Sequence, residues 1–356
     1  MKGEQKMIRI GIIGVGGIAD GVHIPEINAA NGGVLTAICD SDEKRLNLIG
    51  DKYNIPKNRR FEDYLKLIAC DDVDAVEICT PNHLHVPMAI DTIKAGKPIN
   101  VEKPLSINLS EAKKLRNVLQ KNGVPNMMCF SYRFKPAVRY AKEILNRKLI
   151  GDILSVNVEY LKSSAFMEGR RLDWRFVKEY AGTGVLGDLG VHLIDMAQFL
   201  IGDMTRVCAE AGIIVKQRKK LDSDEFGNVE TDDYCNFMAD FECGAHGMFT
   251  VTRCAIGHIN TIKYDIYGTK GVLSFDLNNP NILKVCIGDI DVESFGMHEI
   301  KVPDKYKITQ EQMFIDLVSG KKCEYLPTVA DGLNCQKILD TLLESSINKT
   351  WLELKN

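Results

Sequence analysis

The sequence predicts an α/β protein with a doubly wound parallel sheet in its N-terminal part and an α+β domain with a large, mostly antiparallel sheet in its C-terminal part. Two observations indicate this. From residue 8 to about residue 130, short apolar runs alternate with helical patterns over short connections, as expected for a parallel sheet. Beyond residue 130, strand candidates follow one another with few helices between them, which is typical of an antiparallel sheet.

The strands and helices expected in the N-terminal part are predicted from apolar runs and from residues that begin or end helices. The run IRIGIIG at 8–14 is apolar on both faces, so we expect a buried parallel strand. Ser41 is a plausible N-cap for the helix that follows the second strand, and glycines end two later helices. The expected strands are 8–14, 34–40, 73–79, 98–101 and 126–130, and the expected helices are 18–31, 42–52, 61–69, 86–95 and 110–122.

The pattern of expected strands and helices changes near 128–134, where we place a domain boundary. The resulting domains are 1–130, for cofactor binding, and 131–356, for substrate binding and oligomerisation. The helix expected at 329–348 could pack back on the first domain. The other elements expected in the second domain are a helix at 136–145 and strands at 153–161, 205–215, 234–241, 245–254, 264–268 and 271–276.

Composition excludes several classes of protein. The net charge is −3 and no basic stripe occurs, which argues against a nucleic-acid partner. The chain has no apolar run of about 18 residues, so we expect no membrane span, and no apolar signal segment precedes residue 8. The 11 cysteines form no C-x-x-C pair, so we expect no metal site and a reducing, cytoplasmic environment.

A glycine fingerprint stands between the first strand and the first helix. Gly14, Gly16, Gly17, Ile18 and Ala19 form G-x-G-x-x-A, in which the first glycine permits a tight turn and the second lets backbone N–H groups approach a pyrophosphate. Asp40 ends the second strand, where an acid accepts hydrogen bonds from the adenosine ribose and repels a 2′-phosphate. The pattern predicts a Rossmann domain that binds NAD, with NADP less favoured. Asp40 could instead cap the next helix together with Ser41, and both roles can coexist.

Three later segments complete a recognisable set. The segment TPNHLH at 80–85 and EKP at 102–104 follow parallel strands, at the sheet edge where ligands bind in such folds. GDLGVH occupies 187–192. Together with GVGGIA at 14–19, these motifs resemble the Gfo/Idh/MocA oxidoreductases, the family of glucose–fructose oxidoreductase and inositol dehydrogenase. The resemblance covers nearly the whole chain, and the ordered set is specific although each motif alone is not.

The resemblance implies positions for the cofactor. Thr80, Pro81, Asn82 and His85 would lie along the nicotinamide half, and Glu102 and Lys103 at the nicotinamide itself. Trp174 and Arg175, in LDWRF, are similar to a Trp-Arg pair that reaches the cofactor in some members. The alternative for this pair is a Trp packed under the second sheet beside a solvated Arg.

Hydride transfer from an alcohol also needs a proton acceptor, for which Lys103 and His192 are the candidates. A helix through 188–192 would put Asp188 and His192 on one face. The resemblance implies His192 as general acid/base and Lys103 as hydrogen-bond partner of the reacting oxygen. Asp188 would bind a neighbouring substrate hydroxyl or position these two groups. Which of Lys103 and His192 is the principal base stays open. Tyr132 and Arg133 complete the expected substrate set.

We therefore predict an NAD(H)-dependent dehydrogenase that acts on a secondary hydroxyl of a sugar, an anhydrosugar or an inositol-like cyclitol. The alternatives are a nucleotide-sugar or other carbonyl reductase of the same fold, and a non-catalytic regulator that senses NAD or a sugar. A regulator of this fold is expected to lose the catalytic Lys or His. Because Lys103, Asp188 and His192 are all present, the sequence favours an enzyme. The uncovered face of an antiparallel sheet must be buried, so we expect a homodimer or homotetramer.

Overall fold

The computed structural model describes residues 7–354. These residues divide into two compact units, one formed by residues 7–129 with 308–333 and the other by residues 130–307 with 334–354. The division after residue 129 lies next to the domain boundary expected from the sequence. The segment 308–333, which we had placed in the second domain, belongs to the first unit, and so does the beginning of helix α11 (Val329–Asn348).

The first unit is built on a parallel sheet of six strands in the order β3-β2-β1-β4-β5-β6. The chain moves outward from β1 to β3 and then returns to the other side of β1. This reversal creates a switch point between β1 and β4, where ligands bind at the carboxyl ends of the strands. The strands are β1 (Ile8–Ile13), β2 (Gly33–Cys39), β3 (Arg60–Phe61), β4 (Ala75–Ile78), β5 (Ile99–Val101) and β6 (Asn126–Met128). The prediction of a Rossmann sheet is confirmed.

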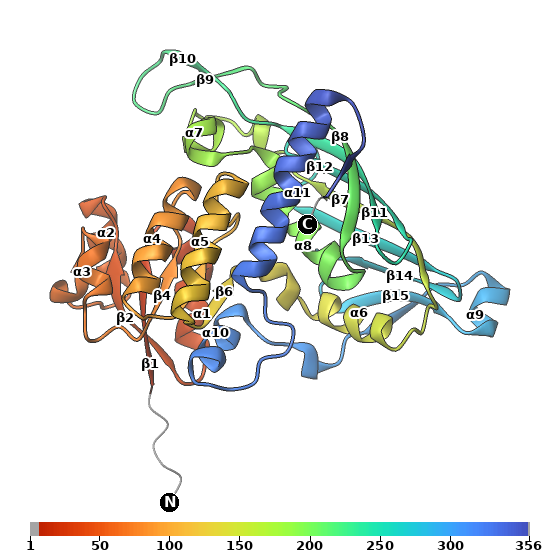
Figure 1. The fold of residues 1–356 in the computed structure, drawn as a ribbon, viewed down its shortest axis with the longest axis horizontal. Helices are drawn as coiled ribbons and strands as arrows, with labels where there is room; N and C mark the ends of the chain where they lie inside the picture. Colours follow the sequence, from red (N-terminus) through yellow and green to blue (C-terminus); the bar gives the residue numbers. More distant parts are fainter. Residues whose placement is uncertain (1–6, 355–356) are drawn as a thin grey trace, which may run out of the picture. The chain divides into compact units, whose positions relative to one another are not determined.

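Four of the six helices of this unit begin at a side-chain cap, and two of the sequence-based assignments are corrected. Asp42, rather than Ser41, caps α2, because its Oδ1 accepts the Arg45 N–H at 3.1 Å. Helix α4 begins at Asn82, directly after Pro81, rather than at Val86. The helices are α1 (Ile24–Ala29), α2 (Glu43–Lys52), α3 (Tyr64–Ile68), α4 (Asn82–Lys94), α5 (Leu109–Asn122) and α10 (Gln310–Val318), and Figure 1 shows α4 and α5 side by side.

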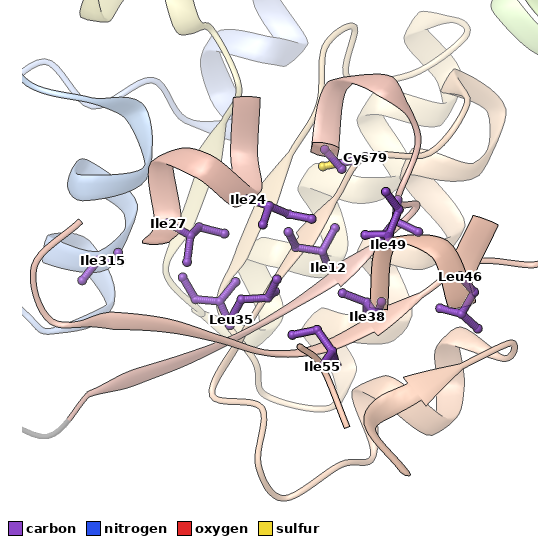
Figure 2. Packing of buried hydrophobic residues seen from close by; sticks show 13 residues of the cluster. Ile12, Ile24, Ile27, Leu35, Ile38, Leu46, Ile49, Ile55, Cys79 and Ile315 are labelled. Carbon is purple, nitrogen blue, oxygen red and sulfur yellow. The ribbon is translucent and has the colours of Figure 1, made fainter. Parts of the chain in front are cut away.

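A buried aliphatic cluster explains why a segment from late in the chain belongs to this unit. Figure 2 shows Ile315 of α10 beside Ile27 and Leu35, which come from α1 and β2. At Gly33 an added Cβ would lie only 2.3 Å from Ile315 Cδ1, so the absence of a side chain there lets α10 pack closely on β2. The burial of Ile315, which is 1% exposed, therefore fixes α10 to the first sheet.

The second unit contains a nine-stranded sheet in the order β16-β15-β14-β13-β7-β12-β11-β8-β17. Only the β7–β12 pairing is parallel, so the sheet is mostly antiparallel, as predicted. The predicted strands are β7 (Ile153–Leu161), β8 (Met204–Gly212), β11 (Tyr234–Phe241), β12 (His246–Thr252), β13 (Thr261–Gly268) and β14 (Gly271–Asp276). The strands that we did not predict are β15 (Ile282–Ile287), β16 (His298–Lys301), the pair β9 (Gln217–Lys219) and β10 (Phe226–Asn228), and β17 (Leu352–Glu353).

Helix α8 (Val191–Leu200) is the central helix of this unit and is buried at nearly every position. It packs against β7 and against α6 (Pro136–Asn146). A buried ion pair ties it to the preceding segment: Arg133 Nε donates to Asp195 Oδ2 at 2.8 Å, and Arg133 Nη2 donates to Asp195 Oδ1 at 2.6 Å. The two residues are 4% and 1% exposed, so the pair satisfies charges that would otherwise be buried alone.

Within residues 7–354, the structure contains no helix that is both long enough and apolar enough to span a membrane.

Breaking the Arg133–Asp195 pair is expected to destabilise the protein. Asp195→Asn removes the charge that compensates the buried guanidinium, which should cost about 3 kcal/mol of unfolding free energy, measured by urea denaturation. Asp152→Asn is the matched control, because Asp152 is 78% exposed and pairs with Lys148 at the surface. Equal effects of the two substitutions would contradict the structural role of the buried pair.

Candidate active site

The glycine turn after β1 has the geometry that a dinucleotide requires. Gly14 has φ +89°, and an added Cβ would lie 2.8 Å from the carbonyl oxygen of Cys79, so only glycine fits there. Around Gly16 and Gly17 an added Cβ would meet nothing within 4 Å, and Ile18 is 43% exposed. The turn thus leaves open space beside its backbone, which a pyrophosphate can approach closely.

A continuous helical segment follows this turn. It begins as a π-helical turn at Ala19–His23 and continues as α1. The first N–H groups of a helix have no partner within the helix and attract negative charge. Ala19 is fully buried, so the helix start lies tight against the sheet. These residues fit the phosphates of a nicotinamide dinucleotide.

Asp40 is held at the carboxyl end of β2 and is 8% exposed. Its Oδ2 accepts the Val15 N–H of the glycine turn at 3.0 Å, and its Oδ1 accepts the Asp42 N–H at 2.9 Å. Arg45 Nη1 lies 3.3 Å from Oδ2. Asp40 therefore connects the glycine turn to the start of α2, whereas Asp42 is the helix cap. The ribose role of Asp40 stays a prediction.

His85 contacts the backbone segments that follow β4 and β5. It lies in the first turns of α4 and is 1% exposed, with Nδ1 at 2.8 Å from the Pro104 carbonyl oxygen and Nε2 at 2.8 Å from the Thr80 carbonyl oxygen. Burial lowers the pKa of His85, while the two carbonyls oppose this effect. A neutral ring donates to one carbonyl and an imidazolium to both. In either state the ring links the segment after β4, with Thr80, Pro81 and Asn82, to the segment after β5.

Glu102 and Lys103 directly follow β5. Lys103 is half-buried, and Glu102 is 9% exposed. Glu102 Oε2 accepts the Lys103 backbone N–H at 3.1 Å, and Oε1 lies 2.9 Å from Nε2 of His23. Burial acts to raise the pKa of Glu102, but the hydrogen bond and charge of His23 hold it below its ordinary value. Both carboxylate oxygens of Glu102 thus have partners within the protein, and its contact with the nicotinamide stays a prediction.

Sequence reasoning missed the residues behind Glu102. His23 also faces Glu311 and Glu77, and all three residues are fully buried. Among the described residues, two groups could hold a metal ion, His23 with Glu77 and Cys79, and His23 with Glu102 and Cys129. One signal was available, because Glu77 is the charged residue in the run AVEIC, whose other residues are apolar.

In the second unit, Asp188 and His192 lie at the start of a long helical segment. Asp188 belongs to a π-helical turn at Leu186–Gly190, and His192 to the first turn of α8. Asp232 anchors this start, because its carboxylate accepts the Gly184 N–H at 2.6 Å and the Leu186 N–H at 2.8 Å. The segment is therefore helical at both positions. His192 is 7% exposed and Asp188 is half-buried.

His192 contacts Tyr132, which is hydrogen-bonded to a further tyrosine and an asparagine. The Tyr132 ring makes an edge contact with the imidazole at 4.5 Å between centroids, and its hydroxyl lies 3.0 Å from that of Tyr160. Tyr160 in turn donates to Asn260 Oδ1 at 2.9 Å. Burial, Tyr132 and Asp188 raise the pKa of Tyr160, so this hydroxyl stays protonated. A carboxylate, an imidazole, two hydroxyls and an amide thus gather in one unit, a set suited to a polyhydroxylated ligand. Tyr160 and Asn260 were not predicted.

Two predicted positions have other partners in the structure. The Arg133 guanidinium binds Asp195 and lies over Phe199 at 5.1 Å, and its contact with the substrate stays a prediction. Arg175 lies over the ring of its neighbour Trp174 at 4.4 Å, within a short helical turn capped by Asp173. The Trp174–Arg175 contact with the cofactor stays a prediction.

Comparison with known proteins identifies the two parts of the chain separately. Residues 8–130 match an oxidoreductase family with an NAD-binding Rossmann fold, and residues 138–274 match the GFO/IDH/MocA C-terminal domain. Levoglucosan dehydrogenase of Pseudarthrobacter phenanthrenivorans is 30% identical over 323 residues, which are 82% of this chain and 83% of that protein. D-xylose 1-dehydrogenase [NADP(+)] of Haloarcula marismortui is 26% identical over 74% of this chain and 71% of its own.

Solved structures agree over nearly the full length. An oxidoreductase domain protein from Kribbella flavida has a TM-score of 0.91 and 30% identity, covering 99% of this chain and 100% of its own. A levoglucosan dehydrogenase in complex with NADH has a TM-score of 0.90 and 28% identity, with the same coverage of 99% and 100%.

The turn at Gly14 is expected to tolerate no side chain. Gly14→Ala adds a Cβ that meets the Cys79 carbonyl oxygen, in addition to the cost of positive φ, which is about 1–2 kcal/mol. Gly96→Ala is the matched control, since Gly96 has φ +75° and open space around it. Thermal unfolding should show a larger loss for Gly14→Ala, and NAD binding should weaken in that variant alone. A similar loss of stability in both variants would refute the close approach to Cys79.

Proposed function

Because the chain belongs to the GFO/IDH/MocA family of NAD(P)-dependent oxidoreductases, we propose that it is an NAD(H)-dependent dehydrogenase acting on a secondary hydroxyl of a sugar, an anhydrosugar or a cyclitol. The proposal rests chiefly on the group formed by Asp188, His192, Tyr132, Tyr160 and Asn260. These are donors and acceptors for hydroxyl groups, and one of them, an imidazole, can exchange a proton near neutral pH.

The turn at 14–19 and Asp40 would hold the dinucleotide, whose nicotinamide would supply the acceptor or donor of the hydride at the carbinol carbon. His192 takes the hydroxyl proton, and the edge of Tyr132 fixes the orientation of its ring. Lys103 binds the reacting oxygen, and Asp188 accepts a hydrogen bond from a neighbouring hydroxyl. Tyr160 and Asn260 orient Tyr132, whose O–H is donated to Tyr160, so its oxygen is a further acceptor for a substrate hydroxyl. Such proton transfer typically contributes about 10² to 10⁴ in rate.

We also propose NAD rather than NADP as the preferred cofactor, with Asp40 as the selecting residue. Its carboxylate is fixed at the end of β2 by the Val15 and Asp42 N–H groups, and a negative charge there disfavours a 2′-phosphate. Levoglucosan dehydrogenase in complex with NADH is among the similar structures, whereas the xylose dehydrogenase relative is named for NADP. The cofactor preference therefore needs its own test.

The open face of the nine-stranded sheet supports an oligomer of identical chains. Met238 of β11 and Met248 of β12 are directly opposite each other and are 42% and 63% exposed, and Tyr267 of β13, on the same face, is 37% exposed. Apolar side chains gathered on one sheet face favour burial against a second copy. Light scattering at micromolar concentration should give a dimer or tetramer mass, and a monomer mass would remove this proposal.

The first experiment follows the absorbance of reduced nicotinamide with NAD or NADP against inositols, hexoses, anhydrosugars and sugar acids. We expect turnover with at least one polyol and faster turnover with NAD. No turnover across the panel, with NAD still bound in calorimetry, would instead favour a nucleotide-sugar substrate or a regulator.

The proposed roles of Lys103 and His192 predict a loss of turnover in the variants Lys103→Met and His192→Ala. Because both groups act on the reacting oxygen or its proton, kcat/KM should fall by about 10² or more, while calorimetry still detects NAD binding. The controls are Lys94→Met and His246→Ala, which change exposed residues of the same types. Normal turnover in both active-site variants would refute the assignment.

The cofactor proposal predicts that Asp40→Ala changes the preference between NAD and NADP. The ratio of kcat/KM for NAD to that for NADP should fall about tenfold, because the carboxylate that binds the ribose and repels the phosphate is lost. Asp42→Ala should lower stability through the lost helix cap and leave the ratio unchanged. An unchanged ratio in Asp40→Ala would remove Asp40 as the selecting residue.

A further inference from the structure

A chain of buried acid and imidazole groups lies behind the Lys103 segment, entirely within the first unit. His23, at the end of the π-helical turn, has Nδ1 at 2.8 Å from Glu311 Oε1 and at 3.2 Å from Glu77 Oε2. On the other side of its ring, Nε2 lies 2.9 Å from Glu102 Oε1. Glu102 Oε2 accepts the Lys103 backbone N–H. The connected path thus runs from Glu311 of α10 through His23 and Glu102 to Lys103.

The proton count of this path is constrained by chemistry. A neutral imidazole carries one N–H, and an ionised carboxylate can only accept. His23 faces carboxyl oxygens on both sides, so the contacts are satisfied only by an imidazolium or by a protonated glutamate that donates to the ring. In both arrangements the chain holds one proton more than a neutral imidazole between two ionised carboxylates would hold.

The surroundings indicate where that proton resides. Burial and the neighbouring Glu77 raise the pKa of Glu311 to about 8, and its Oε2 is buried without a hydrogen-bond partner. Burial opposes charge on His23, but Cys79, Glu311 and Glu102 raise its pKa well above the ordinary value. The remaining polar neighbours are Asn100, which donates to Glu77 at 3.2 Å, Gln310, which donates to Glu311 at 3.0 Å, and the thiols of Cys79 and Cys129.

We propose that Glu311, His23 and Glu102 form a buried proton-holding chain in which Glu102 is the positioning residue of Lys103. His23 keeps Glu102 ionised and fixed, and Glu102 holds the backbone of Lys103. Ionisation of Glu311 adds a negative charge to the chain and thereby favours the ammonium form of Lys103. The importance of this proton-holding chain for turnover rests on the proposed function. The existence of the proton-holding chain and its effect on Lys103 are independent of that function.

A metal ion is the competing explanation, because His23 belongs to both metal-competent groups. The distances of 2.8–2.9 Å from the ring nitrogens to Glu311 and Glu102 are those of direct hydrogen bonds, and they need no ion. Metal analysis of the purified protein is therefore part of the test, and one tightly bound metal ion per protein molecule would overturn the proposal.

The first measurement determines the protonation of His23 in the protein without cofactor or substrate. Long-range ¹H–¹⁵N correlation spectra resolve the ring nitrogens of the 7 histidines, and His23→Gln identifies the signal. We expect both ring nitrogens of His23 to carry protons at pH values well above the ordinary imidazole midpoint of about 6.5. A neutral His23 ring at pH 7, with a proton on only one ring nitrogen and none on Glu311, would overturn the proposed proton-holding chain.

The second measurement tests the connection to Lys103. Competitive acetylation of the intact protein, read by mass spectrometry of the Lys103 peptide, gives the pH of half-maximal labelling. Glu311→Gln removes a carboxylate that is ionised when Lys103 titrates, so this pH should fall by about half a unit or more. Asp316→Asn is the matched control, because it removes a carboxylate from the same helix that pairs instead with Lys321.

Equal labelling curves for Glu311→Gln and Asp316→Asn would overturn the proposed effect of the proton-holding chain on Lys103. Should Glu311→Gln fail to fold, the His23 spectra of the unchanged protein still decide whether the chain exists, and Glu102→Gln replaces it in the labelling experiment. Neither measurement uses turnover. An inactive protein with the expected spectra and labelling would therefore contradict the proposed function alone.

Discussion

A charge inside a protein must be paired or hydrogen-bonded, and this constraint shapes both units around their candidate site residues. In the second unit the Arg133–Asp195 pair ties the segment that carries Tyr132 to the helix that carries His192. In the first unit His23 lies between Glu102 and Glu311, and Glu102 in turn holds the Lys103 backbone. The residues assigned to chemistry are therefore next to residues whose charges are already satisfied, and their positions follow from those buried pairs.

The same constraint applies to backbone groups at the starts of helices. Asp232 accepts two N–H groups before the helical segment of Asp188 and His192, and an added Cβ at Gly184 would lie only 2.0 Å from the Asp232 carbonyl oxygen. Asp40 performs a related task in the first unit, because one of its oxygens accepts the Val15 N–H. A carboxylate that orders a loop is also pre-organised for a ligand, since its position no longer has to be fixed on binding.

Sequence patterns predicted what is local and failed where the determinants are distant in the chain. The apolar runs gave β1, β7, β11 and β14 nearly to the residue, because period and burial are encoded along each strand. The assignment of 308–333 to the first unit was missed, since it depends on Ile315 packing at Gly33. Likewise, motifs marked Lys103 and His192, whereas the partners His23, Glu311, Tyr160 and Asn260 lie outside any motif and are brought in by tertiary structure alone.

Stability alone does not account for the buried acids of the first unit. Burying ionisable groups costs free energy, and replacing them by apolar side chains of similar volume is often neutral or stabilising. Glu77, Glu311 and His23 are nevertheless fully buried, and Glu77 lies within a strand whose other residues are apolar. What distinguishes this cluster from the Arg133–Asp195 pair is its uneven charge. Three carboxyl groups surround one imidazole, so a proton must be shared among them. An arrangement that holds a mobile proton can respond to pH, whereas a balanced ion pair only fixes a position.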